Sequence, residues 1–179
     1  MRKIVSYLFI TLDGVVESPE KWVMYNDEMG TAINSMSHAA DTLLLGRRTY
    51  DTFAASWPQR TNEDDPLADW MNNTAKVVVS STVQDPTWNN TSAITSEVDK
   101  QVQLLKEQDG NDILISGSPT LVRSLLKDKL LDELRLFVHP IVAGTGLRLF
   151  GDDSTSLQLA DSKTLDNGVL YTTYQPAGD

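Results

Sequence analysis

The sequence predicts an α/β fold in which helices cover both faces of a mixed, mainly parallel β-sheet. Short β-rich apolar runs alternate with segments of helical periodicity along most of the chain, as in parallel sheets with crossover helices. The 179 residues suffice for one well-buried core and are too few for two comfortable domains. We therefore expect residues 1–179 to form a single three-layer α/β/α sandwich whose sheet ends in an antiparallel C-terminal hairpin.

Several segments have the composition of β-strands. In chain order they are residues 3–10, 42–45, 76–80, 112–116, 133–142, 157–164 and 169–174. The first run ends at the turn-forming Asp13-Gly14, and the second is closed by Gly46, as in a strand buried on both faces. The last two runs are separated by Asn167-Gly168, which is typical of a type I′ hairpin.

The expected helices alternate with these strands. The first follows the N-cap candidates Asn26 and Asp27, and its apolar stripe is Met29, Ile33, Met36 and Ala40. The second covers residues 49–55 and stops at Trp57-Pro58, and the third covers residues 67–72. Residues 59–66 and 86–91 are expected to be loops.

The last two helices have start signals in the sequence. Ser96 followed by Asp99 resembles a capping box, and the buried stripe behind it is Val98, Val102 and Leu105. Ser118-Pro119 places serine at the N-cap and proline at the first helical position. The buried face of this helix is Leu121, Val122, Leu125 and Leu126.

Charge and composition exclude several function classes. A net charge of -10 disfavours nucleic-acid binding, because such a surface repels phosphate backbones. The chain has no cysteine, and His38 and His139 lie too far apart to suggest a metal site. No run approaches the length of a membrane span, and the N-terminus lacks the apolar region of a signal peptide. We expect a cytoplasmic protein without a membrane partner or a metal.

Two turns share a design that suits an anionic ligand. Each of them, Gly46-Arg47-Arg48-Thr49 and Ser116-Gly117-Ser118-Pro119, joins a buried strand directly to a helix. Helix N-termini offer unpaired N–H groups and a partial positive charge, and ligands of open α/β sheets bind at the carboxyl ends of the strands. Any α/β protein also needs glycines and caps at such junctions. Neither turn has the sequence of a Walker loop or of a Rossmann fingerprint.

The residues around the first turn, Leu44-Leu45-Gly46-Arg47-Arg48-Thr49-Tyr50, resemble the Gly-Arg-x-Thr-aromatic motif of the dihydrofolate reductase superfamily. The match is better to the branch that resembles the C-terminal reductase domain of the bifunctional riboflavin-biosynthesis deaminase–reductase. Three further blocks agree in order and spacing, namely residues 12–14, 115–121 and 138–150. The resemblance spans nearly the whole chain without a deaminase portion, and it implies a stand-alone dihydrofolate reductase-like domain.

The resemblance implies that NADPH lies across the carboxyl ends of the strands. Both turns would contact its phosphates, and the end of the strand at residues 76–80 would meet the adenosine ribose and its 2′-phosphate. The residues implied to bind the cofactor are Gly46, Arg47, Arg48, Thr49, Ser80, Ser81, Gly117, Ser118 and Thr120. Taken without the resemblance, Ser80-Ser81 is better explained as an ordinary polar strand end.

The second turn departs from dihydrofolate reductase, which has paired glycines joined by an unusual cis peptide. Here the pair is Gly117-Ser118. A non-proline cis bond costs about 3 kcal/mol, so the sequence leaves the geometry of this peptide open.

Four residues are candidates for the substrate side. Asp27 falls where dihydrofolate reductase places the carboxylate that supports protonation, and it is equally a helix cap, whereas for Glu28 capping is favoured over substrate binding. Asp13 is a candidate for shaping the nicotinamide end, or a turn-forming residue before glycine. Trp22 is a candidate for stacking on an aromatic substrate, or a cover for the core.

The expected function is that of an NADPH-dependent reductase that transfers hydride to a small pterin- or pyrimidine-like heterocycle. A dinucleotide-binding module or sensor without turnover is an alternative, as is a small-molecule binder without dinucleotide. A 5-amino-6-(5-phosphoribosylamino)uracil reductase is less favoured, because the arginines outside the first turn are scattered and form no evident phosphate clamp. Related proteins pair through strands of the sheet, so a homodimer is expected.

Overall fold

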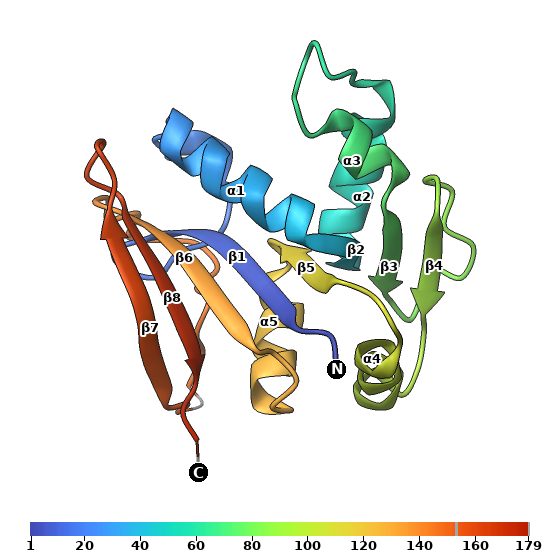
Figure 1. Cartoon of the computed structure of the whole chain (residues 1–179). Coiled ribbons are helices and arrows are strands. Elements are labelled where there is room, and N and C mark those ends of the chain that lie inside the picture. The colour runs from blue at the N-terminus through green and yellow to red at the C-terminus, as the bar shows by residue number, and fades with distance from the viewer. Residues whose placement is uncertain (153, 179) are drawn as a thin grey trace.

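The computed structural model describes residues 1–152 and 154–178 and confirms the α/β sandwich (Figure 1). The strands are β1 (Ile4–Thr11), β2 (Ala40–Gly46), β3 (Ala75–Val79), β4 (Thr91–Ile94), β5 (Asp112–Ser116), β6 (Glu133–His139), β7 (Leu157–Thr164) and β8 (Leu170–Pro176). The α-helices are α1 (Asp27–Ala39), α2 (Arg47–Ser56), α3 (Ala68–Asn73), α4 (Val98–Glu107) and α5 (Pro119–Lys127). Short 3-10 helices span Pro19–Lys21 and Trp57–Gln59.

The eight strands form one sheet in the order β4-β3-β2-β5-β1-β6-β8-β7. The strands from β4 to β6 in this order run parallel, whereas β8 is antiparallel to both β6 and β7. The parallel strands therefore end at one common edge. Adjacent residues at this edge include Gly46 beside Val79, and Thr11 beside His139.

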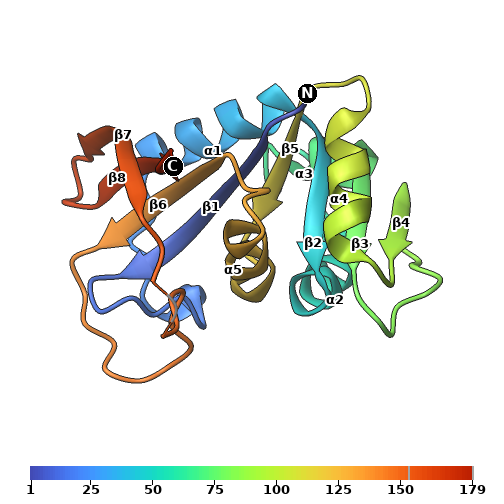
Figure 2. The same cartoon turned by 90° about the horizontal axis from the view of Figure 1, so that it is seen from below.

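Helices form the outer layers and bury two apolar clusters (Figures 1 and 2). On one face α1, α2 and α3 pack on the sheet through side chains such as Met29, Tyr50 and Met71. On the other face α4 and α5 pack through Val102, Leu125 and their neighbours. The apolar stripes expected from the sequence thus face the sheet, except that Ala40, expected in the first helix, is the first residue of β2.

The central strand β1 is covered unevenly. On the face that carries α5, Ile4 and Leu8 are buried. Val5, Tyr7 and Phe9 lie on the face that carries α1, because every second residue of a strand points to the same side. Of these three residues Val5 is buried, whereas Tyr7 and Phe9 are only half-buried. The middle of β1 therefore presents an aromatic surface, made by Tyr7 and Phe9, that the helices leave partly open.

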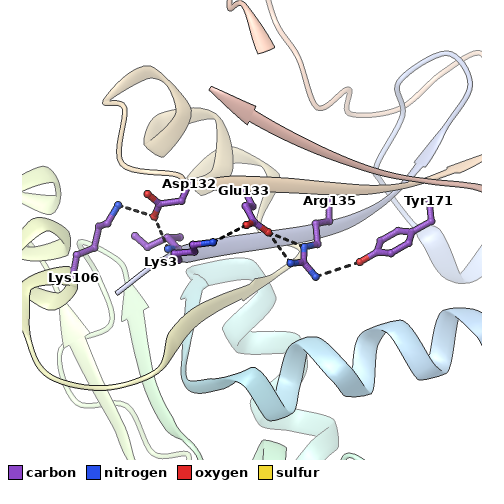
Figure 3. A network of polar contacts seen from close by, with 7 residues as sticks. Lys3, Lys106, Asp132, Glu133, Arg135 and Tyr171 are labelled. Carbon is purple, nitrogen blue, oxygen red and sulfur yellow. Dashed lines mark hydrogen bonds and ion pairs between the residues drawn. The ribbon is translucent and has the colours of Figure 1, made fainter. Parts of the chain in front are cut away.

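Charged side chains tie the strands together at the opposite, amino-terminal edge (Figure 3). Glu133 accepts hydrogen bonds from Lys3 at 3.2 Å and from Arg135 at 2.6 Å, and Arg135 reaches the Tyr171 hydroxyl at 3.4 Å. Burial would raise the pKa of Glu133, but the hydrogen bonds from Arg135 and Lys3 hold it below its usual value. These contacts link β6 to the residue before β1 and to β8.

Two strand predictions were wrong. Residues 91–94, which were not expected to be a strand, form the edge strand β4 parallel to β3. The strand expected over residues 133–142 ends at His139, because proline follows it and lacks the N–H that a strand ladder needs.

The C-terminal hairpin is confirmed, but its turn is not type I′. Gly168 donates to the Leu165 carbonyl at 2.9 Å, and Leu165 donates to the Val169 carbonyl at 2.9 Å. Only Gly168 of this turn has a positive φ, of 81°, whereas a type I′ turn needs positive φ at both central residues. The hairpin therefore has a three-residue loop that ends in a left-handed glycine.

Helix α4 does not begin with the capping box that the sequence indicated. The N-cap is Glu97, with a φ of 46° and no side-chain hydrogen bond to the helix, so Ser96 and Asp99 form no capping box. Within the described residues, no helix is both long and apolar enough to cross a membrane.

Candidate functional site

The two glycine turns meet at one cavity of about 540 Å³ at the carboxyl edge of the sheet. Adjacent strands β2 and β5 bring the turns together, because α2 follows β2 directly and only Gly117 and Ser118 separate β5 from α5. Six of the nine residues expected to bind the cofactor line this cavity. They are Gly46, Arg47, Arg48, Thr49, Ser118 and Thr120.

Ser118 joins the two turns. Its Oγ accepts a hydrogen bond from the Gly46 N–H at 2.8 Å and donates one to Thr49 Oγ1 at 2.9 Å. A side chain on Gly46 would start 3.3 Å from this serine, so the approach favours glycine at position 46. Ser118 is the N-cap residue of α5, as expected, but its hydroxyl bridges to the other turn and does not cap its own helix.

The backbone of the second turn is left-handed at two successive residues. Gly117 has a φ of 75° and Ser118 a φ of 57°, and the peptide bond between them is trans. The glycine takes this conformation at no steric cost, whereas the serine does so under strain that its two hydrogen bonds offset. The turn directs the start of α5 toward the cavity.

The first turn carries the positive charge of the cavity. Arg47 donates to Thr82 Oγ1 at 2.7 Å and lies 3.4 Å from Asp51, so it links the start of α2 to the loop after β3. Arg48 is exposed and lines the cavity. Thr82 was missed in the sequence, where it follows the pair Ser80-Ser81.

The two serines after β3 differ in their surroundings. The buried Ser80 hydroxyl accepts hydrogen bonds from the N–H groups of Thr82 at 3.2 Å and Val83 at 3.1 Å, so it organises its own loop. Ser81 is exposed. The preceding residue, Val79, lines the cavity.

Asp13 holds the loop that forms the far wall of the cavity. Its carboxylate accepts hydrogen bonds from Thr11 Oγ1 at 2.6 Å and from the N–H groups of Ala143 at 3.0 Å and Gly144 at 2.8 Å. These bonds, led by that from Thr11, lower its pKa to about 2. Leu147, four residues after Ala143, lines the cavity.

Trp22 covers the end of β6. Its indole ring lies edge-on to the His139 ring with 5.4 Å between centroids, and its Nε1 donates to the Glu17 carbonyl at 3.0 Å. His139 is buried, and Nε2 of its ring has no hydrogen-bond partner among the described residues. Burial lowers the pKa of His139, so the ring is neutral at physiological pH.

The start of α1 distinguishes the two carboxylates predicted there. Asn26 is the cap, since its Oδ1 accepts from the Met29 N–H at 3.0 Å. Glu28 instead accepts hydrogen bonds from Lys163 Nζ at 2.6 Å and from the Asp166 N–H at 2.7 Å. Both bonds lower the pKa of Glu28, and the bond from Lys163 has the larger effect. Asp27 is exposed, and its carboxylate makes no hydrogen bond or ion pair within the described residues. Neither carboxylate is thus the N-cap, although both lie in the first turn of α1, where the helix dipole favours negative charge.

Two tyrosines, Tyr7 and Tyr25, were not predicted as site residues. Tyr7 accepts a hydrogen bond from the Ser116 hydroxyl at 2.7 Å. Burial raises the pKa of Tyr25, and the charges of Asp65 and Asp27 raise it further. A tyrosine within a largely apolar strand was the only signal for Tyr7.

Comparison with known proteins assigns the family. A model of the RibD C-terminal domain matches residues 2–171. The chain belongs to this family. It is 29% identical to the uncharacterized protein YyaP of Bacillus subtilis (strain 168), over 97% of this chain and 94% of YyaP.

Solved structures share the fold of this RibD C-terminal domain. A protein provisionally assigned to riboflavin biosynthesis, from Shewanella sp. PV-4, has a TM-score of 0.79 and 21% identity, covering 99% of this chain and 100% of that one. A dihydrofolate reductase from Enterococcus faecalis, complexed with NADP(H), has a TM-score of 0.67 and 15% identity, covering 98% and 97%. The fold is therefore dihydrofolate reductase-like. Among the described residues, no group of acidic or histidine side chains could hold a metal ion.

Proposed function

We propose that this protein is an NADPH-dependent reductase of a small pterin- or pyrimidine-like heterocycle. The observation that carries the proposal is the cavity where the two glycine turns meet beside Arg47 and Arg48. Membership in the RibD C-terminal domain family and the fold shared with a reductase complexed with NADP(H) support it.

The donors around the cavity fit a dinucleotide. The first N–H groups of α2 and α5 have no partner within their helices, and both helices begin at the cavity. Two guanidinium groups add positive charge in a protein whose net charge is -10. A volume of about 540 Å³ lies in the range of small-ligand sites.

Each part of the cofactor has proposed partners. Arg47, Arg48 and Thr49 hold phosphates, and the turn from Gly117 to Thr120 holds the pyrophosphate. Ser80 contributes by shaping the loop after β3, and Ser81 is the exposed hydroxyl for the 2′-phosphate of the adenosine ribose. The Gly46 N–H is already bonded to Ser118, so Gly46 acts by allowing close approach.

Bound NADPH supplies the hydride, and the chain supplies orientation and a proton. We assign the proton-assisting role to Asp27, because its carboxylate is exposed and makes no hydrogen bond or ion pair with the rest of the described chain. Trp22 and the half-buried Phe9 offer ring surface to a flat substrate. Asp13 and Glu28 act indirectly, by holding the loop at Ala143 and the C-terminal hairpin.

The test is to titrate the purified protein with NADPH and NADH, and then to follow NADPH consumption with pterins and pyrimidines. We expect NADPH to bind more tightly and to be consumed with at least one heterocycle. Binding without consumption would indicate a dinucleotide-binding sensor. Absence of binding at millimolar NADPH would overturn the proposal.

We also propose that two copies pair through the C-terminal edge of the sheet. The edge strand β7 is exposed along almost its whole length, and its Leu159 side chain is 52% exposed. A long exposed edge strand with an apolar side chain is a ready pairing surface. Light scattering on the purified protein should give twice the mass of 19.8 kDa; a monomer at all concentrations would contradict pairing.

A further inference from the structure

Tyr7 stands out as a polar side chain on the aromatic surface of the central strand. Its ring lies edge-on to Phe9 and Phe137, with centroids 6.1 Å and 6.4 Å away. These contacts fix the ring, because edge-to-face pairs of this kind are favourable and the strand backbone is rigid. The hydroxyl is thus held in one place at the middle of β1.

The Tyr7 hydroxyl lies beside the second glycine turn. It is 2.7 Å from the Ser116 hydroxyl, which ends β5, and the Tyr7 carbonyl accepts the Gly117 N–H at 3.2 Å. Gly117 in turn lies against Thr49, with 3.8 Å between the Thr49 side chain and the position of a Cβ on the glycine. The phenol is therefore next to the cofactor cavity but outside its lining.

One hydroxyl hydrogen of the pair Tyr7–Ser116 remains without an acceptor. Two O–H groups share a single hydrogen bond, and neither has a further acceptor in the described part of the chain. Ser116 is buried, whereas Tyr7 is half-buried, so Tyr7 is the member of the pair with side-chain surface left open. A partly buried donor without an acceptor is costly, and a ligand atom can satisfy it.

The phenol keeps its proton under all physiological conditions. Burial raises the pKa of Tyr7 to about 12, the hydrogen bond from Ser116 opposes this shift, and Tyr25 and Asp65 add to it. Asp27 and Asp65 also act on Tyr25. The negative charge of Asp65 thus adds to burial in favouring an uncharged donor over a tyrosinate.

We propose that the Tyr7 hydroxyl is a substrate-binding group that donates a hydrogen bond to a carbonyl oxygen or ring nitrogen of the heterocycle. This inference rests on the proposed function and adds a specificity residue to it. A site that presents a fixed donor selects rings with an acceptor at that position over rings without one, because the analogue leaves the donor unpaired. Ser116 acts as a positioning residue that orients the phenol.

The experiment measures binding of pterin and of uracil to the full chain saturated with NADP+, by calorimetry. The variants are Tyr7→Phe, Ser116→Ala and the control Tyr174→Phe, which removes the same atom from a side chain packed against the opposite apolar cluster. We expect Tyr7→Phe to weaken binding of at least one probe by about 3- to 10-fold, the value of one neutral hydrogen bond. Ser116→Ala should have a smaller effect and Tyr174→Phe none.

A purely structural role predicts a different pattern. In that case Tyr7→Phe and Ser116→Ala would lower the melting temperature alike and leave the dissociation constants of both probes unchanged, which would overturn the proposal. A wild-type protein that binds NADP+ but neither probe would also overturn it, while leaving the dinucleotide site intact. A wild-type protein that does not bind NADP+ is a separate result, and it would overturn the proposed function.

Discussion

The Ser118 hydroxyl binds the Gly46 N–H at 2.8 Å and so ties the turn after β5 to the turn after β2. The two residues are 72 positions apart in the sequence. This bond keeps the starts of α2 and α5 at a fixed separation, which a ligand that spans both turns requires.

Replacing Ser118 should therefore loosen both turns. Ser118→Ala leaves a partly buried N–H unpaired, and we expect a loss of about 1–3 kcal/mol in the free energy of unfolding, measured with urea. Ser118→Gly also removes the hydroxyl but relieves the positive φ of 57°, so it should cost less. Equal stability of Ser118→Ala and wild type would show that the bond does not hold the turns.

Asp27 provides a test of the substrate side. Asp27→Asn keeps the shape of the side chain but removes the charge, so we expect turnover with an active heterocycle to fall at least tenfold, as for loss of a general acid or base. NADPH affinity should stay unchanged, because Asp27 does not line the cofactor cavity. Asp128→Asn, at the C-cap of α5, is a matched control. Full activity of Asp27→Asn would contradict the assignment.

Asp13 makes the loop at Ala143 and Gly144 dependent on pH. The folded-state pKa of about 2 lies below the ordinary value of 3.8, so the unfolded chain binds the proton more readily. The contribution of this carboxylate to stability is complete above about pH 4 and is lost as the pH falls toward 2.

The same loop can be tested at neutral pH. In Asp13→Asn the amides of Ala143 and Gly144 lose a charged acceptor and should exchange hydrogen several-fold faster. Amides in α5 serve as the internal control. Unchanged exchange at both positions would mean that the carboxylate does not hold the loop.

Glu133 should matter for stability and not for ligand binding. Its side chain is only 10% exposed, and Glu133→Gln leaves Arg135 without its anionic partner. We expect a loss of about 1–3 kcal/mol in unfolding free energy, with unchanged NADPH affinity because the network lies at the opposite edge of the sheet. Glu107→Gln, on exposed α4 surface, is the control. If Glu133→Gln lost no more stability than the control Glu107→Gln, this role for Glu133 would be contradicted.

The pH dependence of the stability that Glu133 contributes follows from the direction of its pKa shift. The pKa of Glu133 is lower in the folded state, so its stabilising effect is present above the pKa of the unfolded chain and disappears as the pH falls through the folded value. Wild type and Glu133→Gln should therefore converge in stability under acidic conditions. A difference that persists in acid would have another origin.

Sequence reasoning predicted the elements that bury a regular apolar pattern. The stripe from Met29 to Met36 was identified by its helical spacing, and the run from Leu43 to Leu45 by its continuous apolar composition before a glycine. The strand β4 was missed because its four residues are half-buried or exposed and lie at the edge of the sheet. Local pattern carries no signal for such a strand, since only the neighbouring β3 makes it one.

The site was predictable where backbone turns define it and not where distant side chains do. The turns at Gly46 and Gly117 follow from strand–glycine–helix junctions, and the structure brings them together. The loop and hairpin partners of Asp13 and Glu28 lie at least 130 positions away in the chain, so the roles of these carboxylates in holding a loop and a hairpin were invisible in the sequence. Tyr7 was overlooked because burial was assumed for its whole strand.

The affinity of NADPH for the wild type, for Arg48→Ala and for Arg60→Ala tests the central claim most directly. Both variants remove one exposed positive charge, but Arg48 lines the cavity, whereas Arg60 lies over the Trp57 ring outside it. We predict that the wild type binds NADPH, that Arg48→Ala binds it about tenfold more weakly, and that Arg60→Ala binds it as the wild type does. Equal affinities for all three proteins, or no binding by the wild type, would contradict the account.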